Sequence, residues 1–295
     1  MESPLLVLHL ADWFAAAGEA SWAQALEAGK VLYFPGLAFR LEPQEAPLLT
    51  PALLAEGVRN ISLDAQGRLK GVAGDEATQA RVAGMMERFA RQARALLKGL
   101  VPAYDAHLRP APTSLRPAQV STRRQSVRAD DRRMHVDAFP TRPNYGERIL
   151  RVFTNINPHG QPREWRIGEP FEDVARRFLP RARPYSPRQA QLLRLTKSLR
   201  SEYDHMMLQL HDLMKADEDY QRDGPQLGFP FPPGSTWVCF SDQTVHAAMA
   251  GQYMLEQTLH LPVAHQYDPQ ASPLAILTRL AGRPLAGAPL PPSKA

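Results

Sequence analysis

The 295-residue sequence predicts an α+β protein with a double-stranded β-helix core of the jelly-roll, cupin-like type. Three observations predict this fold class. Strand-like segments gather between about residues 120 and 262, an amphipathic helix precedes them, and a helical stretch interrupts them. The result is an N-terminal helical layer, a jelly-roll core at about 120–262 and a long helical insertion at about 186–222. We expect one domain at 1–265, then a short helix and a proline-rich tail at 266–295.

The N-terminal part opens with a helix and a strand. Residues 21–37, SWAQALEAGKVLYFPGL, indicate a short helix ended by Gly29, then the strand KVLYF and a Pro-Gly turn. Residues 76–100 place a helical stripe of apolar side chains on one face: Val82, Met85, Met86, Phe89, Ala93, Leu96 and Leu97. The proline- and arginine-rich stretch 101–133 reads as a connector rather than a helix.

Three strand-like segments follow the connector. They are MHVDAF (134–139), RILRVFTNINP (148–158), and STWVCFSDQTVHAAM (235–249) with its continuation QYMLEQTLHLP (252–262). Between the second and third, Ser186 and Pro187 suit the start of an amphipathic helix that runs to about Asp217. Glycines and prolines at 224–234 then predict a loop, and SPLAILTRLAGR (272–283) predicts the C-terminal helix.

Composition limits the class of protein. The 44% hydrophobic and 22% charged residues are typical of a globular domain. A net charge of +5 and a pI near 9.5 favour anionic partners. The one cysteine, Cys239, excludes an internal disulfide and a cysteine-based zinc site, and its place in a strand indicates a buried small hydrophobe. With no signal peptide or apolar run of about 18 residues, the expected location is the cytoplasm.

The stretch RRMHVDAFP (132–140) carries the first candidate ligands. Side chains two apart in a strand share one side, so His135 and Asp137 present an imidazole and a carboxylate together. A jelly roll returns a late strand beside an early one, and His246 then completes a two-His-one-carboxylate set, with open positions on Fe(II) for a co-substrate and O2. His260 is the competing third ligand. His205 and His211, six apart on a helix, miss zinc-site spacing and suit surface or packing roles.

A site of this kind that uses 2-oxoglutarate also needs a cation for the far carboxylate. No Arg or Lys follows His246 at about ten residues, where Glu256 and Gln257 stand. The strand 148–158 supplies Arg148 and Arg151, and alternation puts Arg151, Phe153 and Asn155 on one face. Arg151 is our first choice for the carboxylate. The other candidates for binding 2-oxoglutarate are Arg148, Asn155, Arg163 and Trp165.

Segments 121–158, 201–221 and 231–258 together resemble the Kdo (3-deoxy-D-manno-oct-2-ulosonic acid) hydroxylases, Fe(II)/2-oxoglutarate-dependent dioxygenases of Gram-negative bacteria. The resemblance implies metal ligands at His135, Asp137 and His246. It also implies hydroxylation at carbon 3 of the outer Kdo of Kdo2-lipid A in lipopolysaccharide, with succinate and CO2 as co-products. It places the reaction on the cytoplasmic face of the inner membrane, and ascorbate is the expected reductant that maintains the iron.

An anionic, lipid-linked sugar suits the charge of the chain. Arg123, Arg124 and Arg128, with Arg132 and Arg133, precede the metal segment and are candidate substrate-binding residues; a solvated basic loop is the equal alternative. The C-terminal helix offers Leu274, Ile276, Leu277 and Leu280 for peripheral membrane contact, although docking on the core is favoured.

Two other classes remain as hypotheses. One is a cupin-like enzyme that uses the same three ligands with zinc or manganese for hydrolysis or isomerisation of an anionic sugar or small molecule. The other is a non-catalytic nucleic-acid binder built on the arginine cluster. That second class is disfavoured, and no nucleic acid is expected as a partner, because the cluster lacks interleaved aromatics and a recognisable binding motif.

Overall fold

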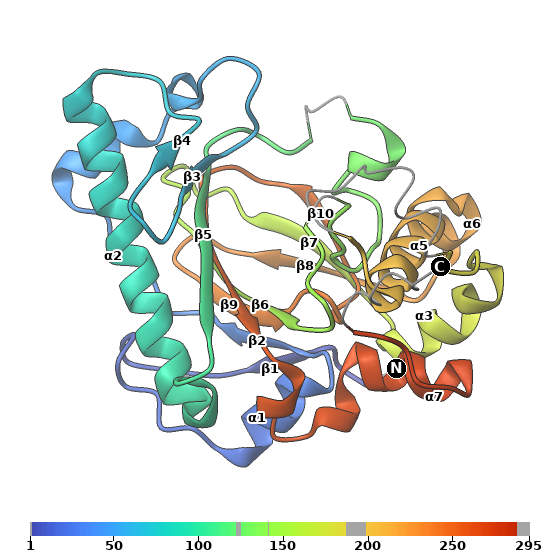
Figure 1. Ribbon diagram of the computed structural model, residues 1–295. Coiled ribbons are helices and arrows are strands. Elements are labelled where there is room, and N and C mark those ends of the chain that lie inside the picture. Colours follow the sequence, from blue (N-terminus) through green and yellow to red (C-terminus); the bar gives the residue numbers. More distant parts are fainter. Residues whose placement is uncertain (1, 122–124, 141, 187–198, 288–295) are drawn as a thin grey trace.

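The computed structural model describes residues 2–121, 125–140, 142–186 and 199–287, and its strands form two sheets (Figure 1). The larger has the order β1-β2-β9-β6-β11-β5-β3-β4 and the smaller the order β10-β7-β8. The strands are β1 Leu5–Val7, β2 Val31–Phe34, β3 Ile61–Leu63, β4 Leu69–Lys70, β5 Arg109–Arg116, β6 Arg148–Asn155, β7 Arg163–Gly168, β8 Gln226–Phe231, β9 Thr236–Phe240, β10 His246–Ala250 and β11 Met254–Leu261.

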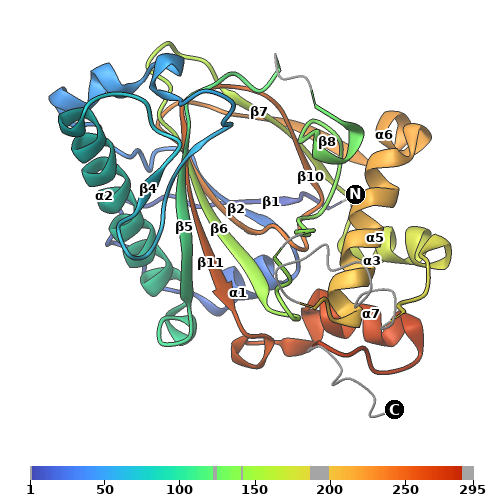
Figure 2. The same ribbon diagram turned by 45° about the horizontal axis from the view of Figure 1, so that its top comes forward.

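The small sheet lies opposite the middle of the large one (Figure 2). An aromatic cluster fills the space between them: Phe153 of β6 and Trp237 of β9 stack with ring centroids 5.3 Å apart, and Trp165 of β7 meets both rings edge-on. Burial of these large rings holds the two sheets together. Phe153 and Trp165 of this cluster line the same cavity as the candidate ligands His135, Asp137 and His246.

The helices are α1 Ala20–Glu27, α2 Glu76–Leu100, α3 Phe171–Phe178, α5 Glu202–Ala216, α6 Glu218–Asp223 and α7 Pro273–Ala281. The helices α1 and α2 pack on the large sheet, whereas α3, α5, α6 and α7 gather at one side of the two sheets (Figure 2). The long helix α2 packs on the large sheet, and its predicted apolar stripe, Val82 to Leu97, is buried at every predicted position. The structure thereby confirms the prediction for 76–100, and the predicted helix and strand at 21–37 are α1 and β2.

The segment MHVDAF is not a strand. Apart from a single bridge between His135 and His246, residues 134–139 are extended chain outside both sheets. Their apolar members Met134, Val136 and Ala138 instead pack into a cluster formed with α3, α5 and α7. Alternation was therefore a correct guide to which side each residue faces, but helices rather than a second sheet strand cover the apolar side.

The sheets also contain strands that the sequence did not predict. The connector 101–133 contains β5, which pairs with β11 and β3, and the loop 224–234 contains β8. Prolines hid both strands, because a proline cannot donate a ladder hydrogen bond; β8 tolerates Pro230 as an edge strand beside β7. The large sheet therefore begins well before residue 120, and the N-terminal part is not only a helical layer.

The helical insertion differs from the single long helix predicted from Ser186. Residues 187–198 lie outside the described residues, and 199–201 are not helical. Ser201 starts α5: its hydroxyl accepts a hydrogen bond from Asp204 N, while the Asp204 carboxylate accepts one from Ser201 N. This reciprocal cap fixes the start of the helix, and within the described part of the insertion the chain forms two helices, α5 and α6, rather than one.

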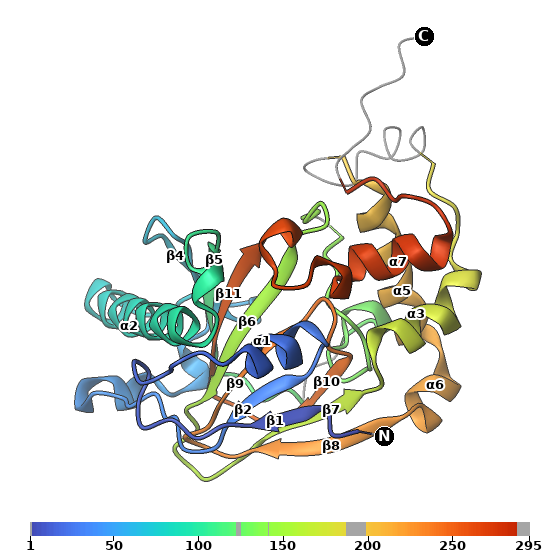
Figure 3. The same cartoon turned by 90° about the horizontal axis from the view of Figure 1, so that it is seen from below.

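The predicted C-terminal helix is α7, which packs beside α3 and α5 (Figure 3). Its Ile276 and Leu277 are buried in the same cluster as α3, so docking on the core is confirmed for these two residues. Part of the predicted proline-rich tail, 288–295, lies outside the described residues. No helix in the described part of the chain is both long and apolar enough to span a membrane.

Candidate metal centre

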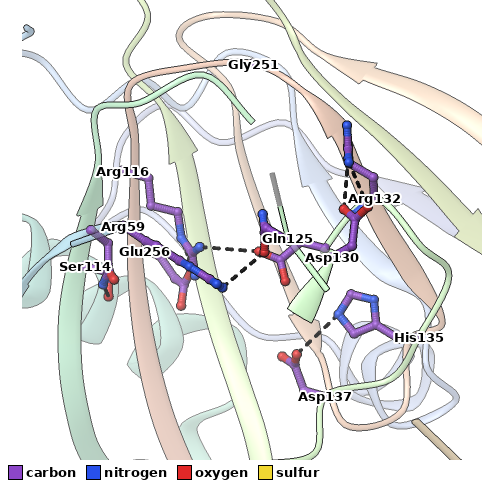
Figure 4. Close-up of polar contacts among 12 residues, drawn as sticks. Arg59, Ser114, Arg116, Gln125, Asp130, Arg132, His135, Asp137, Gly251 and Glu256 are labelled. Atoms are coloured by element: carbon purple, nitrogen blue, oxygen red, sulfur yellow. Dashed lines mark hydrogen bonds and ion pairs between the residues drawn. The ribbon is translucent and has the colours of Figure 1, made fainter. Parts of the chain in front are cut away.

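The structure brings His135, Asp137 and His246 together. One possible ligand atom from each lies within 4.8 Å of the others. The backbone sets this arrangement: His135 N donates to His246 O at 3.0 Å, His246 N donates to His135 O at 2.9 Å, and Asp137 N donates to Ser241 O at 2.8 Å. The segment at 134–139 is thus tied to the start of β10 although 111 positions separate the two histidines. Figure 4 shows His135 and Asp137 facing one another.

Both imidazoles are held in one tautomer. His135 Nδ1 lies 2.7 Å from the carbonyl oxygen of Arg133, and His246 Nδ1 lies 2.8 Å from that of Thr244. A carbonyl accepts only, so each Nδ1 carries the proton and donates it. Each Nε2 then keeps its lone pair for a metal.

Packing fixes the ring planes as well. The Trp165 ring stacks on His246 at a centroid distance of 4.9 Å, and the His211 ring meets His135 edge-on at 5.5 Å. His211 therefore has the packing role predicted for it, while His205 binds the Arg183 carbonyl through Nε2 at 2.9 Å. Aromatic packing of this kind limits rotation of the imidazoles, so the site is preorganised.

The protonation states suit a cation. Burial lowers the pKa of His135 to about 4 and also lowers that of His246. For Asp137, burial opposes ionisation, but the Arg151 guanidinium and the neighbouring histidines outweigh it and hold the pKa well below its usual range. At neutral pH the site therefore presents two neutral imidazoles and one carboxylate, the form in which these groups bind metals.

The low pKa of His135 predicts acid sensitivity of the metal-free protein. Between pH 6.5 and 4 the unfolded chain binds a proton at His135 that the folded chain does not, so stability is present above pH 6.5 and is lost as the pH falls. The free energy of unfolding, measured with urea across this range, should fall by up to about 1.4 kcal/mol per pH unit from this residue. His135→Asn should flatten the slope, whereas His159→Asn, at an exposed histidine, should not. Equal slopes for wild type and His135→Asn would refute the assignment.

Charged side chains surround the three candidate ligands. They line a cavity of about 140 Å³ in which arginines and carboxylates are equal in number: Arg116, Arg151 and Arg163 against Asp131, Asp137 and Glu256. Arg151 lies between two of the carboxylates, 3.0 Å from Asp137 Oδ2 and 3.0 Å from Glu256 Oε1. Arg116 lies 2.9 Å from the other oxygen of Glu256. With neutral histidines these charges cancel, so a bound divalent cation would require about two further negative charges from a co-substrate.

The predicted 2-oxoglutarate residues separate into two groups. Arg151, Arg163 and Trp165 line this cavity. Arg148 does not: it is fully buried on the other face of β6, with Nε 2.8 Å from Asp242 Oδ2 and its guanidinium over the Phe240 ring. Asn155 is also placed elsewhere, since its amide nitrogen donates to Gln161 O and Phe231 O. The structure therefore gives Arg148 and Asn155 structural roles.

The arginine cluster before the triad is only partly described. Arg123 and Arg124 lie outside the described residues. Arg128 is exposed and pairs with Asp212 at 3.1 Å, Arg132 with Asp130 at 2.8 Å, and Arg133 with Glu218 at 2.6 Å. Each described arginine of the cluster is therefore paired with a carboxylate, of the loop itself for Arg132 and of α5 or α6 for the other two, and none of the three lines the metal cavity.

Sequence reasoning missed Arg116 and the role of Glu256. Arg116 lies in β5, which proline residues concealed, and Glu256 was noted only because it occupies the position where a cation was sought. The pairing of β5 with β11 sets the two side chains beside each other. His260 lies outside the group of three possible ligands. Cys239 is buried, as expected for a small hydrophobe in a strand, and burial raises the pKa of its thiol to about 12.

Two facing sheets with a buried two-His-one-carboxylate set define the protein as a mononuclear metal enzyme of the kind that uses non-haem Fe(II). Comparison with known proteins makes the assignment specific. The family model described as 3-deoxy-D-manno-oct-2-ulosonic acid (Kdo) hydroxylase matches residues 11–284. The chain belongs to the Kdo hydroxylase family.

Solved structures agree with the family. The Kdo hydroxylase KdoO, described as a non-heme Fe(II) α-ketoglutarate-dependent dioxygenase, in complex with α-ketoglutarate and Fe(III), is 43% identical over 96% of this chain and 98% of that chain, with a TM-score of 0.91. KdoO in complex with cobalt(II) is 42% identical over 99% of each chain, with a TM-score of 0.92. No curated protein matches the chain. The prediction of an Fe(II)/2-oxoglutarate-dependent dioxygenase is confirmed by these relatives.

Proposed function

We propose that the protein hydroxylates carbon 3 of the outer Kdo of Kdo2-lipid A, with O2 and 2-oxoglutarate consumed and succinate and CO2 released. Kdo hydroxylation is the activity named for the family and for its solved members. The carbon position and the lipid A context rest on the resemblance of the three long segments. The two-sheet core would be the double-stranded β-helix expected of a dioxygenase domain at 1–265, with the reaction on the cytoplasmic face of the inner membrane.

The observation that carries this proposal is the ligand set itself. Two neutral imidazoles, each with Nδ1 bound to a carbonyl, and one ionised carboxylate suit Fe(II) and leave positions for co-substrate and O2. Bound iron would supply the activation of O2 that inserts one oxygen atom into a C–H bond while 2-oxoglutarate is decarboxylated. The chain's own contribution is to orient the reactants and to exclude water.

We assign the far carboxylate of 2-oxoglutarate to Arg151. The positive charge of its guanidinium is paired with the carboxylates of Asp137 and Glu256. When Asp137 also binds a metal, its negative charge is shared, and Arg151 is left with positive charge that a dianion can neutralise. The Trp165 indole N–H, which has no acceptor among the described residues, offers a second donor in the same cavity. Arg163 lines the cavity from β7 and is the alternative.

The assignment predicts the effect of Arg151→Ala. Loss of a charge-assisted pair should raise the KM for 2-oxoglutarate about 10- to 100-fold, because such hydrogen bonds contribute about 1.5–3 kcal/mol. Steady-state succinate formation at saturating acceptor measures this. Arg148→Ala is the comparison, since Arg148 faces away from the cavity and should leave the KM of the folded enzyme unchanged. An unchanged KM in Arg151→Ala would transfer the role to Arg163.

The decisive assay supplies Kdo2-lipid A, Fe(II), 2-oxoglutarate and ascorbate to the purified protein. We expect one added oxygen in the acceptor, found by mass spectrometry, with one succinate formed per hydroxylation; fragmentation would locate the hydroxyl at carbon 3. Product that forms without O2 or 2-oxoglutarate would instead favour the cupin-like metal enzyme. Equal product from wild type and His135→Ala would exclude the site altogether.

A further inference from the structure

A second, larger cavity lies beside the metal cavity. Its volume is about 390 Å³, within the range of small-molecule sites. It is bounded by β3, β5 and β11 and by Phe139, Arg142 and Pro143, which follow Asp137 in the chain. The two cavities share Arg116, Phe139, Arg151 and Glu256 as lining residues. In Figure 4 the side chains of Arg116 and Glu256 lie between Ser114 of the second cavity and Asp137 of the triad. A molecule in the second cavity would therefore border the metal centre.

The lining of this second cavity differs from that of the metal cavity. Neutral polar side chains are prominent: Asn60, Ser62, Ser114 and Thr258. Ser62, Ser114 and Thr258 lie in β3, β5 and β11, and Asn60 directly precedes β3. Asn60 Nδ2 donates to Ser114 Oγ at 3.1 Å, which holds both groups at the wall. Amide and hydroxyl groups both donate and accept, and so match the hydroxyl groups of a sugar.

The cavity also contains a cation whose charge is not balanced locally. Arg116 and Arg151 are each paired with Glu256 and with an aspartate. Arg142 also lines the cavity, is exposed, and has no carboxylate within ion-pair distance among the described residues. Arg128, Arg132 and Arg133, in contrast, all have such partners. Arg142 is therefore the arginine of this region that is best able to bind an anion from outside.

We infer that this cavity binds the acceptor as a sugar acid, with the carboxylate on Arg142 and the sugar hydroxyls on Asn60, Ser62 and Ser114. The inference rests on the proposed function and goes beyond it, because it replaces the arginine cluster 123–128 with a defined subsite. Phosphate groups of a lipid headgroup are the competing anions, and the sugar carboxylate is favoured because groups that match sugar hydroxyls line the same cavity as Arg142.

The test is a binding measurement that needs no turnover. Calorimetry with the cobalt(II)-loaded, 2-oxoglutarate-bound protein would compare a phosphate-free Kdo disaccharide with its methyl ester. Wild type should bind the acid about 10- to 100-fold more tightly than the ester, as expected for a charge-assisted pair. Arg142→Ala should lose this preference by weakening binding of the acid alone, and Arg142→Lys should recover part of it. A preference that survives in Arg142→Ala would overturn the inference.

Controls separate this outcome from failure of the proposed function. Arg91→Ala removes the same charge from an exposed position on α2 and should leave binding of both ligands unchanged. If Arg142→Ala weakens binding of a phosphorylated acceptor but not of the phosphate-free disaccharide, the anion bound by Arg142 is a lipid phosphate and the inference is wrong. If wild type binds the disaccharide through Arg142 but never hydroxylates it, the subsite stands and the proposed reaction fails.

Discussion

His246→Ala is expected to remove Fe(II) binding and hydroxylation together. His246 is the only one of the three ligands that comes from the late strands, and its backbone also anchors His135. Loss of even an outer contact to a metal ligand costs about 10- to 100-fold in metal affinity, so loss of a ligand should cost at least about 100-fold. Isothermal titration with Fe(II) under nitrogen, and product formation at saturating co-substrate, measure the two effects.

His260→Ala is the matched comparison, because His260 was the competing ligand. It lies on β11 and lines the second cavity rather than the triad. This variant should keep wild-type Fe(II) affinity. If His260→Ala lost the metal while His246→Ala retained it, the ligand set proposed here would be incorrect.

Among the substitutions named here, Asp242→Ala is expected to lower the free energy of unfolding most. Asp242 is fully buried, accepts from Arg148 Nε at 2.8 Å and accepts from Ile149 N at 3.1 Å. Removal of one partner leaves the Arg148 charge buried without its counter-ion, which costs about 3–5 kcal/mol. For a chain of this size the melting temperature should then fall by roughly 5–8 °C.

Thermal unfolding of the metal-free protein, followed by circular dichroism, measures this effect. Asp219→Ala provides the comparison, since Asp219 forms an exposed pair with Arg222 and should change the melting temperature little. If Asp242→Ala and Asp219→Ala had the same melting temperature, the Arg148–Asp242 pair would not stabilise the fold as proposed.

Much of the fold could be predicted from local patterns. The stripe in α2 and the apolar runs of β6, β9 and β11 carry enough periodicity to be recognised without tertiary information. The strands β5 and β8 could not, because prolines dominate their local signal. They are strands only because each meets a partner, β11 for one and β7 for the other, that supplies the ladder hydrogen bonds.

For the two arginines of β6, too, the sequence predicts one property and the tertiary structure decides another. Alternation alone puts Arg148 and Arg151 on opposite faces, and that much is visible in the sequence. Which face holds the metal depends on contacts with residues far along the chain: Asp242 and Gln243 lie beside Arg148, and Asp137 and Glu256 beside Arg151. The two arginines are alike in local sequence context, so only these distant partners separate a structural role from a candidate binding role.

The sequence by itself determined the types of candidate ligand, their order and the family. The H-x-D motif, the later histidine and the three long segments can be recognised from the residues alone, without knowledge of distances. Tertiary structure alone decided what surrounds them. It determined the tautomer of each imidazole, the charge balance of the cavity and the partners of Arg116, Arg148 and Arg151. These properties depend on distances between groups that are remote in the chain, and the packing of the two sheets sets those distances.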